Sequence, residues 1–291
     1  AGLSKLGANF EIQNGFVVGS VKSQLIGNKI KLPFPSVGAT ENILMASVLA
    51  KGETKISNAA REPEIEDLSK CLIKMGAKIE GHGTKTILVQ GVTNLKKAEH
   101  EIIADRIVAG TYIIAALMLN SALEINNFDT IYLKSLIDIL KKMGAKLKVS
   151  KNSIKVSKGS KLKSSSLSTS PYPGFPTDLQ AQLMSLMSIS DGKSKIKETI
   201  FENRFMHVPE LNRLGANITV EKDTASIIGN QTFKGAQVMA SDLRASISLV
   251  LAAMNANGQT TLNRVYHLDR GYENIEKTLG SLGAKIKRQK N

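Results

Sequence analysis

One short pattern recurs five times along the chain: Leu, two variable residues, Leu or Met, then Gly-Ala, followed by alternating polar and apolar residues. Successive copies are 69, 68, 71 and 68 residues apart, which indicates repeated structural units. Each glycine predicts the end of an amphipathic helix at a left-handed backbone position, with a strand directly after it. The glycines are Gly7, Gly76, Gly144, Gly215 and Gly283.

The residues around these glycines predict the rest of each unit. After four of them, two short alternating runs flank a polar turn, as in residues 9–21 and 146–158, which is typical of a hairpin. Upstream of the last four lies a second helix that is apolar or small on most faces, which indicates burial. These helices are expected in residues 39–52, 104–120, 177–192 and 241–258, and short strands follow each of them.

One unit is therefore strand, buried helix, strand, amphipathic helix and hairpin. With helices inside and sheets outside, the fold class is α/β, an inside-out barrel of βαβαββ units of about 70 residues. Four whole units and the tail of a fifth are recognisable. Because the chain starts within a unit, and with Ala1 rather than Met, we expect further sequence upstream. The Ser- and Pro-rich residues 157–176 predict a long loop within a unit.

Composition excludes several classes of protein. The longest apolar run, residues 112–119, is far shorter than the roughly 18 residues that a membrane span needs. No secretory signal is visible, which predicts a soluble cytoplasmic protein. Cys71 is the single cysteine, so an internal disulfide is excluded; its place in a helical pattern predicts a buried core thiol. The four histidines have no close pairing, so we expect no zinc site.

The net charge of +14 raises the possibility of nucleic-acid binding. However, the 31 lysines are spread over surface-like positions, and only 4% of residues are aromatic, without the interleaving that base stacking needs. We therefore expect no nucleic-acid partner, although a basic binding scaffold stays an alternative. The eight arginines are more informative, because a rigid guanidinium fork grips a carboxylate or phosphate in a bidentate way.

Three of the four buried helices begin at an aspartate: Asp105, Asp178 and Asp242. The first has Ser36 at that place. This recurrence predicts that all three aspartates cap their helices, since a cap oxygen accepts the free N–H groups of the first turn. Helix N-termini gathered by the repeat would also suit a phosphorylated ligand.

Three other segments depart from the repeat, and each has a plain structural interpretation beside a functional one. Residues 58–68 predict a loop and a capped helix start. Residues 198–211 predict a local ion pair of Glu202 and Arg204 beside His207, and residues 265–276 place Asp269 and Arg270 ahead of a helix. No P-loop, nucleophile elbow or dinucleotide fingerprint occurs. The residues thus favour an enzyme acting on a phosphorylated small molecule, without defining its reaction.

Six segments, taken together and in order, resemble the enolpyruvyl transferases, in particular those that act on UDP-N-acetylglucosamine. They are FPSVGATEN, NAAREPEIEDL, FPTDLQAQ, ETIFENRFMHVPEL, GAQVMASDLRASISLVLA and VYHLDRGYENIE. The resemblance covers essentially the whole chain. It implies two domains of three units each, with residues 1–103 the later part of the first and residues 104–291 the three units of the second.

The resemblance also implies the reaction: transfer of the enolpyruvyl group of phosphoenolpyruvate to the 3-hydroxyl of UDP-N-acetylglucosamine, with release of phosphate and without metal or cofactor. By position, Asp178 would bind that hydroxyl and remove its proton. Arg270 would hold the phosphate, Arg204 and Arg244 would face the carboxylate, and Asp242 would orient the reacting carbons or relay a proton.

The UDP site implied by the resemblance consists of Ser36, Val37 and Gly38 at a helix start, with Ile200 contacting the nucleotide sugar through its backbone. Two departures stand out. The family's catalytic cysteine loop would lie upstream of the present sequence, so we expect little turnover from this chain alone, and Phe34-Pro35 replaces a lysine of some relatives. A transferase acting on shikimate 3-phosphate is the alternative enzyme, and oligomeric state stays open.

Overall fold

The computed structural model describes residues 1–289, which form two compact units. Unit 1 comprises residues 1–103 together with residues 171–173, and unit 2 comprises residues 104–170 and 174–289. The chain thus passes from one unit to the other at Ile103–Ala104 and returns briefly at Pro171–Pro173. Each unit has its own hydrophobic core.

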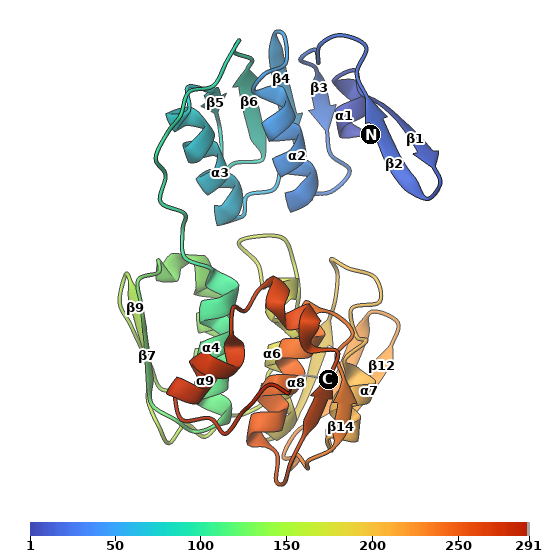
Figure 1. The fold of residues 1–291 in the computed structure, drawn as a ribbon. Coiled ribbons are helices and arrows are strands. Elements are labelled where there is room, and N and C mark those ends of the chain that lie inside the picture. Colours follow the sequence, from blue (N-terminus) through green and yellow to red (C-terminus); the bar gives the residue numbers. More distant parts are fainter. Residues whose placement is uncertain (290–291) are drawn as a thin grey trace. The chain divides into compact units, whose positions relative to one another are not determined.

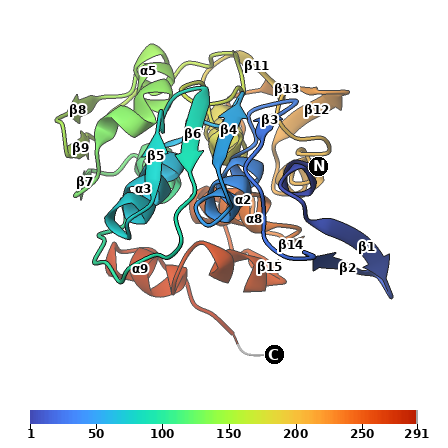
Figure 2. The same ribbon diagram turned by 90° about the horizontal axis from the view of Figure 1, so that it is seen from above.

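Unit 1 places one four-stranded sheet on a face of two helices (Figures 1 and 2). The strand order is β3-β4-β6-β5, with β3 parallel to β4 and the other pairs antiparallel. Its elements are α1 (Gly2–Lys5), β1 (Asn9–Gln13), β2 (Phe16–Ser20), β3 (Lys29–Lys31), α2 (Val37–Ser47), β4 (Glu53–Ser57), α3 (Pro63–Lys74), β5 (Lys78–Glu80) and β6 (Thr86–Gln90).

Unit 2 gathers α4, α6 and α8 side by side, with strands on the outside (Figure 1). Its first part is α4 (Arg106–Met118), β7 (Leu123–Asn126), η1 (Thr130–Leu133), α5 (Lys134–Lys142), β8 (Leu147–Val149), β9 (Ser153–Val156), β10 (Leu167–Ser168), η2 (Thr177–Leu179) and α6 (Gln180–Ile189). Its second part is β11 (Lys193–Lys197), α7 (Val208–Arg213), β12 (Asn217–Glu221), β13 (Thr224–Ile228), β14 (Gln237–Met239), α8 (Leu243–Asn255), β15 (Thr261–Asn263), η3 (Val265–Arg270) and α9 (Ile275–Ser281).

The repeat predicted from sequence is confirmed by two sheets of identical topology. The sheet β10-β11-β13-β12 copies β3-β4-β6-β5 strand for strand, with the same parallel and antiparallel pairs. All five glycines of the repeat have φ between +96° and +104°, the left-handed conformation expected where the helix ends. The remaining sheets are smaller: β7-β9-β8, β14-β15 and the hairpin β1-β2.

Of the four helices predicted to be buried, α4, α6 and α8 are mostly buried, whereas α2 buries only four of its eleven residues, so the prediction is wrong for α2. Eleven of the thirteen residues of α4 and nine of the ten of α6 are buried. By contrast α5, which ends at a repeat glycine, buries only Leu136, Ile137 and Leu140 along one face. The helices inside and the sheets outside therefore give the inside-out arrangement that the sequence predicts.

Several sequence-based expectations need correction. Residues 157–176 are not simply a loop, because they contain β10, which adds a parallel edge strand to β11. Cys71 lies on α3 as expected but is partly buried rather than buried. Helix α3 starts with Pro63 after Glu62, which makes no side-chain cap hydrogen bond. Within residues 1–289, no strand follows Gly283.

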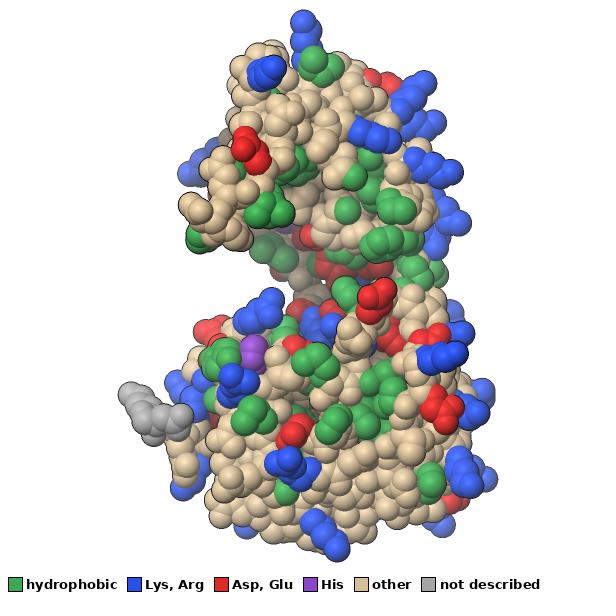
Figure 3. All heavy atoms as spheres, turned by 90° about the vertical axis from the view of Figure 1, so that its right-hand side faces the viewer, with side chains coloured by type: hydrophobic (Ala, Val, Ile, Leu, Met, Phe, Trp, Pro, Cys, Tyr) green, Lys and Arg blue, Asp and Glu red, His purple; other side chains and the backbone are tan. Residues whose placement is uncertain are grey.

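The basic side chains are dispersed over the surface, as the sequence predicts. In Figure 3 the Lys and Arg side chains are spread over the surface of each unit. Among the residues that the structure describes, no helix is both long enough and apolar enough to cross a membrane.

Candidate active site

Two of the three aspartates at helix starts are caps, as predicted. Asp105 Oδ1 accepts the N–H groups of Ile107 at 2.7 Å and Val108 at 3.0 Å at the start of α4. Asp242 Oδ1 does the same for Arg244 at 2.9 Å and Ala245 at 3.0 Å at the start of α8. Each carboxylate satisfies backbone donors that the helix itself cannot pair.

The cap prediction is wrong for Asp178. The start of α6 is a 3-10 turn, Thr177–Leu179, and its first flanking residue is Pro176, so Asp178 lies inside the turn and makes no side-chain cap hydrogen bond. Its carboxylate is therefore available to other groups.

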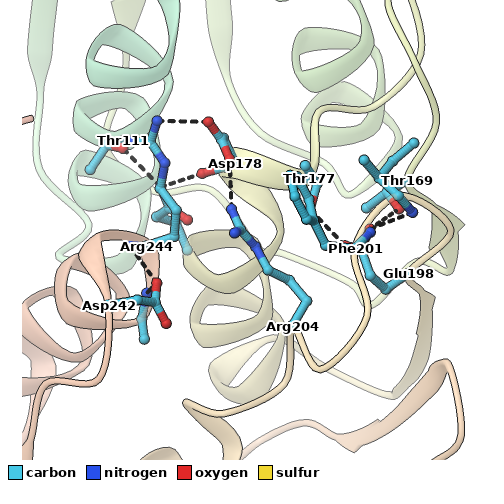
Figure 4. A network of polar contacts seen from close by, with 12 residues as sticks. Thr111, Thr169, Thr177, Asp178, Glu198, Phe201, Arg204, Asp242 and Arg244 are labelled. Atoms are coloured by element: carbon cyan, nitrogen blue, oxygen red, sulfur yellow. Dashed lines mark hydrogen bonds and ion pairs between the residues drawn. The ribbon is translucent and has the colours of Figure 1, made fainter. Parts of the chain in front are cut away.

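Two arginines hold the Asp178 carboxylate (Figure 4). Arg204 Nη2 donates to Oδ1 at 2.6 Å, and Arg244 Nη2 donates to Oδ2 at 2.7 Å. The side chains of Asp178, Arg204 and Arg244 are 35%, 21% and 17% exposed, so the pairs are shielded but reachable from solvent. The arginines come from different elements, the segment before α7 and the first turn of α8, which lie 26 and 66 residues from Asp178.

Arg244 and Asp242 each have a pKa shifted in favour of the charged form. Burial lowers the pKa of Arg244, but the Asp178 carboxylate outweighs it and the pKa ends above its ordinary value. Burial likewise raises the pKa of Asp242, but the N–H groups of Ala245 and Arg244 and the charge of Arg204 bring it below its ordinary value. The site therefore presents fixed charges of both signs.

His207 lies under this cluster and is 1% exposed. Burial lowers its pKa to about 4, against the opposing effect of nearby Asp242, so it is neutral at pH 7. Its Nε2 has no hydrogen-bond partner among the described residues. The expected ion pair of Arg204 with Glu202 does not form, and the histidine is not fully satisfied, so that interpretation of residues 198–211 is wrong.

Glu198 is a functional candidate that the sequence reasoning did not single out. Its side chain is buried, with the whole residue 4% exposed, and it is surrounded by donors. It accepts hydrogen bonds from the hydroxyls of Thr169 and Thr177, at 2.8 and 2.9 Å, and from the N–H groups of Ile200 and Phe201, at 2.9 and 3.2 Å. The N–H of Ile200 is thus already occupied, which leaves its carbonyl for a ligand.

A hollow of about 920 Å³ opens beside Arg204. It is lined by residues 197–206 together with Val220, Lys222 and Asp223. Ile200 lies in this lining, and the ring of Phe201 packs under the Arg204 guanidinium at 5.0 Å from its centroid. The segment between β11 and α7 therefore carries both a cation and an accessible apolar surface.

Arg270 is separate from the ion pairs around Asp178. It ends η3, is exposed, and makes no hydrogen bond or ion pair with the residues that the structure describes. Its neighbour Asp269 is engaged by Arg288, at 2.6 and 2.9 Å. The Arg270 guanidinium on the surface of unit 2 is therefore available to bind an anion.

In unit 1, Ser36 caps α2: its Oγ accepts the N–H of Ala39 at 3.3 Å. Val37 and Gly38 form the first turn of that helix, so their N–H groups are at the positive end of its dipole. Arg61 of the same unit donates to the carbonyl of Tyr172 at 3.0 Å. Among residues 1–289, no group of His, Cys, Asp and Glu side chains is placed to bind a metal ion.

Repeated units with buried helices inside and sheets outside define the enolpyruvyl transferase fold. The enolpyruvyl transferase NikO from Streptomyces tendae superposes with a TM-score of 0.89 over 98% of this chain and 71% of its own, at 26% identity. EPSP synthase from Acinetobacter baumannii shares the fold alone, with a TM-score of 0.75 at 19% identity over 99% of this chain and 71% of its own.

The chain belongs to the EPSP synthase (3-phosphoshikimate 1-carboxyvinyltransferase) family, whose model matches residues 1–279. Among its relatives is the UDP-N-acetylglucosamine 1-carboxyvinyltransferase of Pelagibacter ubique, 52% identical over 98% of this chain and 69% of the relative. Enzymes of the same name from Mesorhizobium japonicum and Acinetobacter baylyi are also 52% identical, over 99% and 98% of this chain and 69% of each relative.

Proposed function

We propose that the complete protein that contains this chain carries out the chemistry named for its relatives: transfer of the enolpyruvyl group of phosphoenolpyruvate to the 3-hydroxyl of UDP-N-acetylglucosamine in peptidoglycan synthesis. The observation that carries the proposal is the Asp178 carboxylate held between the guanidinium groups of Arg204 and Arg244. The reaction requires a general base beside guanidinium groups that can bind the carboxylate of phosphoenolpyruvate. Both substrates are small cytoplasmic molecules, and we place the reaction in the cytoplasm.

The first step is addition across the double bond of phosphoenolpyruvate. Asp178 takes the proton of the sugar hydroxyl as the hydroxyl oxygen bonds to C2 of phosphoenolpyruvate, while C3 gains a proton from the general acid that the family's cysteine loop would supply. The second step is elimination: the bond from C2 to the phosphate oxygen breaks, C3 loses a proton, and the enol ether and phosphate are released. Asp242 would orient the reacting carbons or relay the C3 proton, as a carboxylate fixed at the start of α8.

The arginines would stabilise the charge of phosphoenolpyruvate throughout. Arg204 and Arg244 would bind its carboxylate, and Arg270 its phosphate, without reorganisation of the fixed forks. In the structure the first two hold Asp178 instead. A substrate carboxylate would therefore take the place of Asp178 on the two forks and release it toward the hydroxyl.

The nucleotide sugar would be held by the helix start at Ser36, Val37 and Gly38 in unit 1 and by the backbone of Ile200 in unit 2. A helix N-terminus suits a diphosphate because its N–H groups and dipole both favour negative charge. We further propose that residues 1–103 are the later part of one enolpyruvyl transferase domain and residues 104–291 three units of a second.

The test is phosphate release from phosphoenolpyruvate and UDP-N-acetylglucosamine. Because the chain spans 67–69% of its relatives' length, the assay uses the complete gene product that contains it. We expect phosphate and an enolpyruvyl nucleotide sugar in equal amounts. Phosphate release with shikimate 3-phosphate and not with the nucleotide sugar would overturn the substrate assignment, and no release with either would overturn the proposed function.

A further inference from the structure

Glu198 is a buried carboxylate without a cation partner among residues 1–289. Buried carboxylates are rare unless they are paired, because burial removes their hydration. Here four donors replace that hydration: two hydroxyls on the side chains of Thr169 and Thr177, and the N–H groups of Ile200 and Phe201. An acceptor-only group satisfies all four, whereas an amide would present two N–H donors of its own.

Three of these donors belong to the two segments that carry the candidate site. Thr177 directly precedes Asp178, and Ile200 and Phe201 start the segment that ends in Arg204 and His207. Thr169, in a third segment, donates its hydroxyl to the Glu198 carboxylate and accepts the N–H of Thr199 at 2.9 Å. Glu198 therefore links the start of α6 to the segment before α7.

The contacts form a closed ring, and Figure 4 draws its hydrogen bonds and ion pair. Glu198 binds the hydroxyl of Thr177, and the next residue, Asp178, binds Arg204 at 2.6 Å. The Arg204 guanidinium lies over the ring of Phe201, whose N–H returns to Glu198. The buried Glu198 carboxylate is thus linked, through neighbouring residues, to both Asp178 and Arg204.

We propose that Glu198 is a positioning residue for the transferase reaction, acting through Thr177 on Asp178 and through Ile200 and Phe201 on the segment that carries Arg204. This inference rests on the proposed function. It predicts that the negative charge of Glu198 matters for turnover although its carboxylate is buried away from the reacting atoms.

The experiment uses the complete gene product and the variants Glu198→Gln, Thr177→Val and Thr177→Ser. Glu221→Gln is the matched control, because Glu221 is exposed at the end of β12 in the same unit. We expect Glu198→Gln to lower kcat about 10- to 100-fold, the scale of a misplaced catalytic group. Thr177→Val should also lower kcat, whereas Thr177→Ser should restore kcat to near the wild-type value. The control Glu221→Gln should match wild type.

A double-mutant cycle separates positioning from an independent role of Thr177. If Glu198 acts through Thr177, adding Thr177→Val to Glu198→Gln should lower kcat much less than it does in wild type. Losses that simply multiply would overturn the proposal, as would a Glu198→Gln enzyme with wild-type kcat. Should Glu198→Gln fail to fold, the comparison of Thr177→Val with Thr177→Ser decides, and equal kcat values would overturn it.

Amide hydrogen exchange at Ile200 and Phe201 gives a readout that does not depend on the reaction. In Glu198→Gln these two amides should exchange about three- to tenfold faster, as expected for weakened hydrogen bonds, and in Glu221→Gln they should not change. If wild type releases no phosphate, the proposed function fails while exchange still tests the linkage. Unchanged exchange at both amides would overturn the positioning role.

Discussion

The starts of α4 and α8 differ from the start of α6, although the sequence repeat places an aspartate at each. Asp105 and Asp242 turn inward to the N–H groups of their own helices. Asp178 turns outward to Arg204 and Arg244. A capping carboxylate is held in place by backbone N–H groups, whereas a carboxylate paired only with side chains can exchange both partners for a substrate.

The physical cause of the difference is local. Pro176 precedes a 3-10 turn, and this shifts Asp178 from the cap position into the turn. The buried helix still forms, because its stability comes from α6 packing against α4 and α8. The repeat thus supplies the framework of helices and sheets. In one copy, a 3-10 turn at the helix start moves the aspartate out of the cap position, and its carboxylate becomes the reactive group.

After substitution of Asp178 itself, the largest effect that sharpens this comparison should come from the arginines. Arg204→Lys and Arg244→Lys remove the planar forks while keeping the charge. We expect kcat/KM for phosphoenolpyruvate to fall about 100- to 1,000-fold for each, as for loss of a donor to developing charge. Steady-state kinetics measures this, with the exposed Arg213→Lys as control. Losses below about fivefold would contradict a role of the forks in the reaction.

The next effect concerns His207, which is buried near Asp242 and Arg204. Its folded pKa of about 4 lies below the ordinary 6.5, so on acidification the unfolded chain binds the proton first. The free energy of unfolding should therefore fall by about 3 kcal/mol from pH 7 to pH 4 through this residue.

His207→Gln keeps a donor at this position but does not titrate there. Denaturant unfolding at pH 7, 6, 5 and 4 should show a shallower pH dependence for the variant than for wild type. Identical pH dependence in the two proteins would show that His207 is not buried in its neutral form.

The smallest effect concerns a true cap. Asp105→Ala should lower the free energy of unfolding by about 0.5–2 kcal/mol, the usual cost of a lost cap, and leave kcat close to wild type. Thermal and denaturant unfolding measure the first quantity, and the phosphate assay measures the second. A large loss of kcat without loss of stability would contradict a purely structural role of Asp105.

The sequence was sufficient to predict the framework, because its signals are local. The repeat glycines, the alternating hairpin strands and the uniformly apolar helices each reflect neighbouring residues, and all were confirmed apart from the burial of α2. The resemblance also grouped Asp178, Arg204 and Arg244, which do lie together.

What could not be read from the sequence depends on contacts between distant segments. The partner of Arg204 is 26 residues away rather than the nearby Glu202, and no periodicity encodes that choice. Glu198 did leave a signal. The strand β11 alternates exposed and buried residues, and continuing that alternation by one residue points a glutamate into the core. A charged residue at an inward position marks a group that the interior must satisfy.

The most direct measurement is turnover of Asp178→Asn beside Asp105→Asn in the complete gene product. Asparagine caps a helix about as well as aspartate, so this pair separates loss of a base from loss of a cap. We expect Asp178→Asn to lower kcat about 100- to 10,000-fold with little change in melting temperature, and Asp105→Asn to remain close to wild type. An Asp178→Asn enzyme that keeps most of its turnover would contradict the assignment of Asp178 as the base.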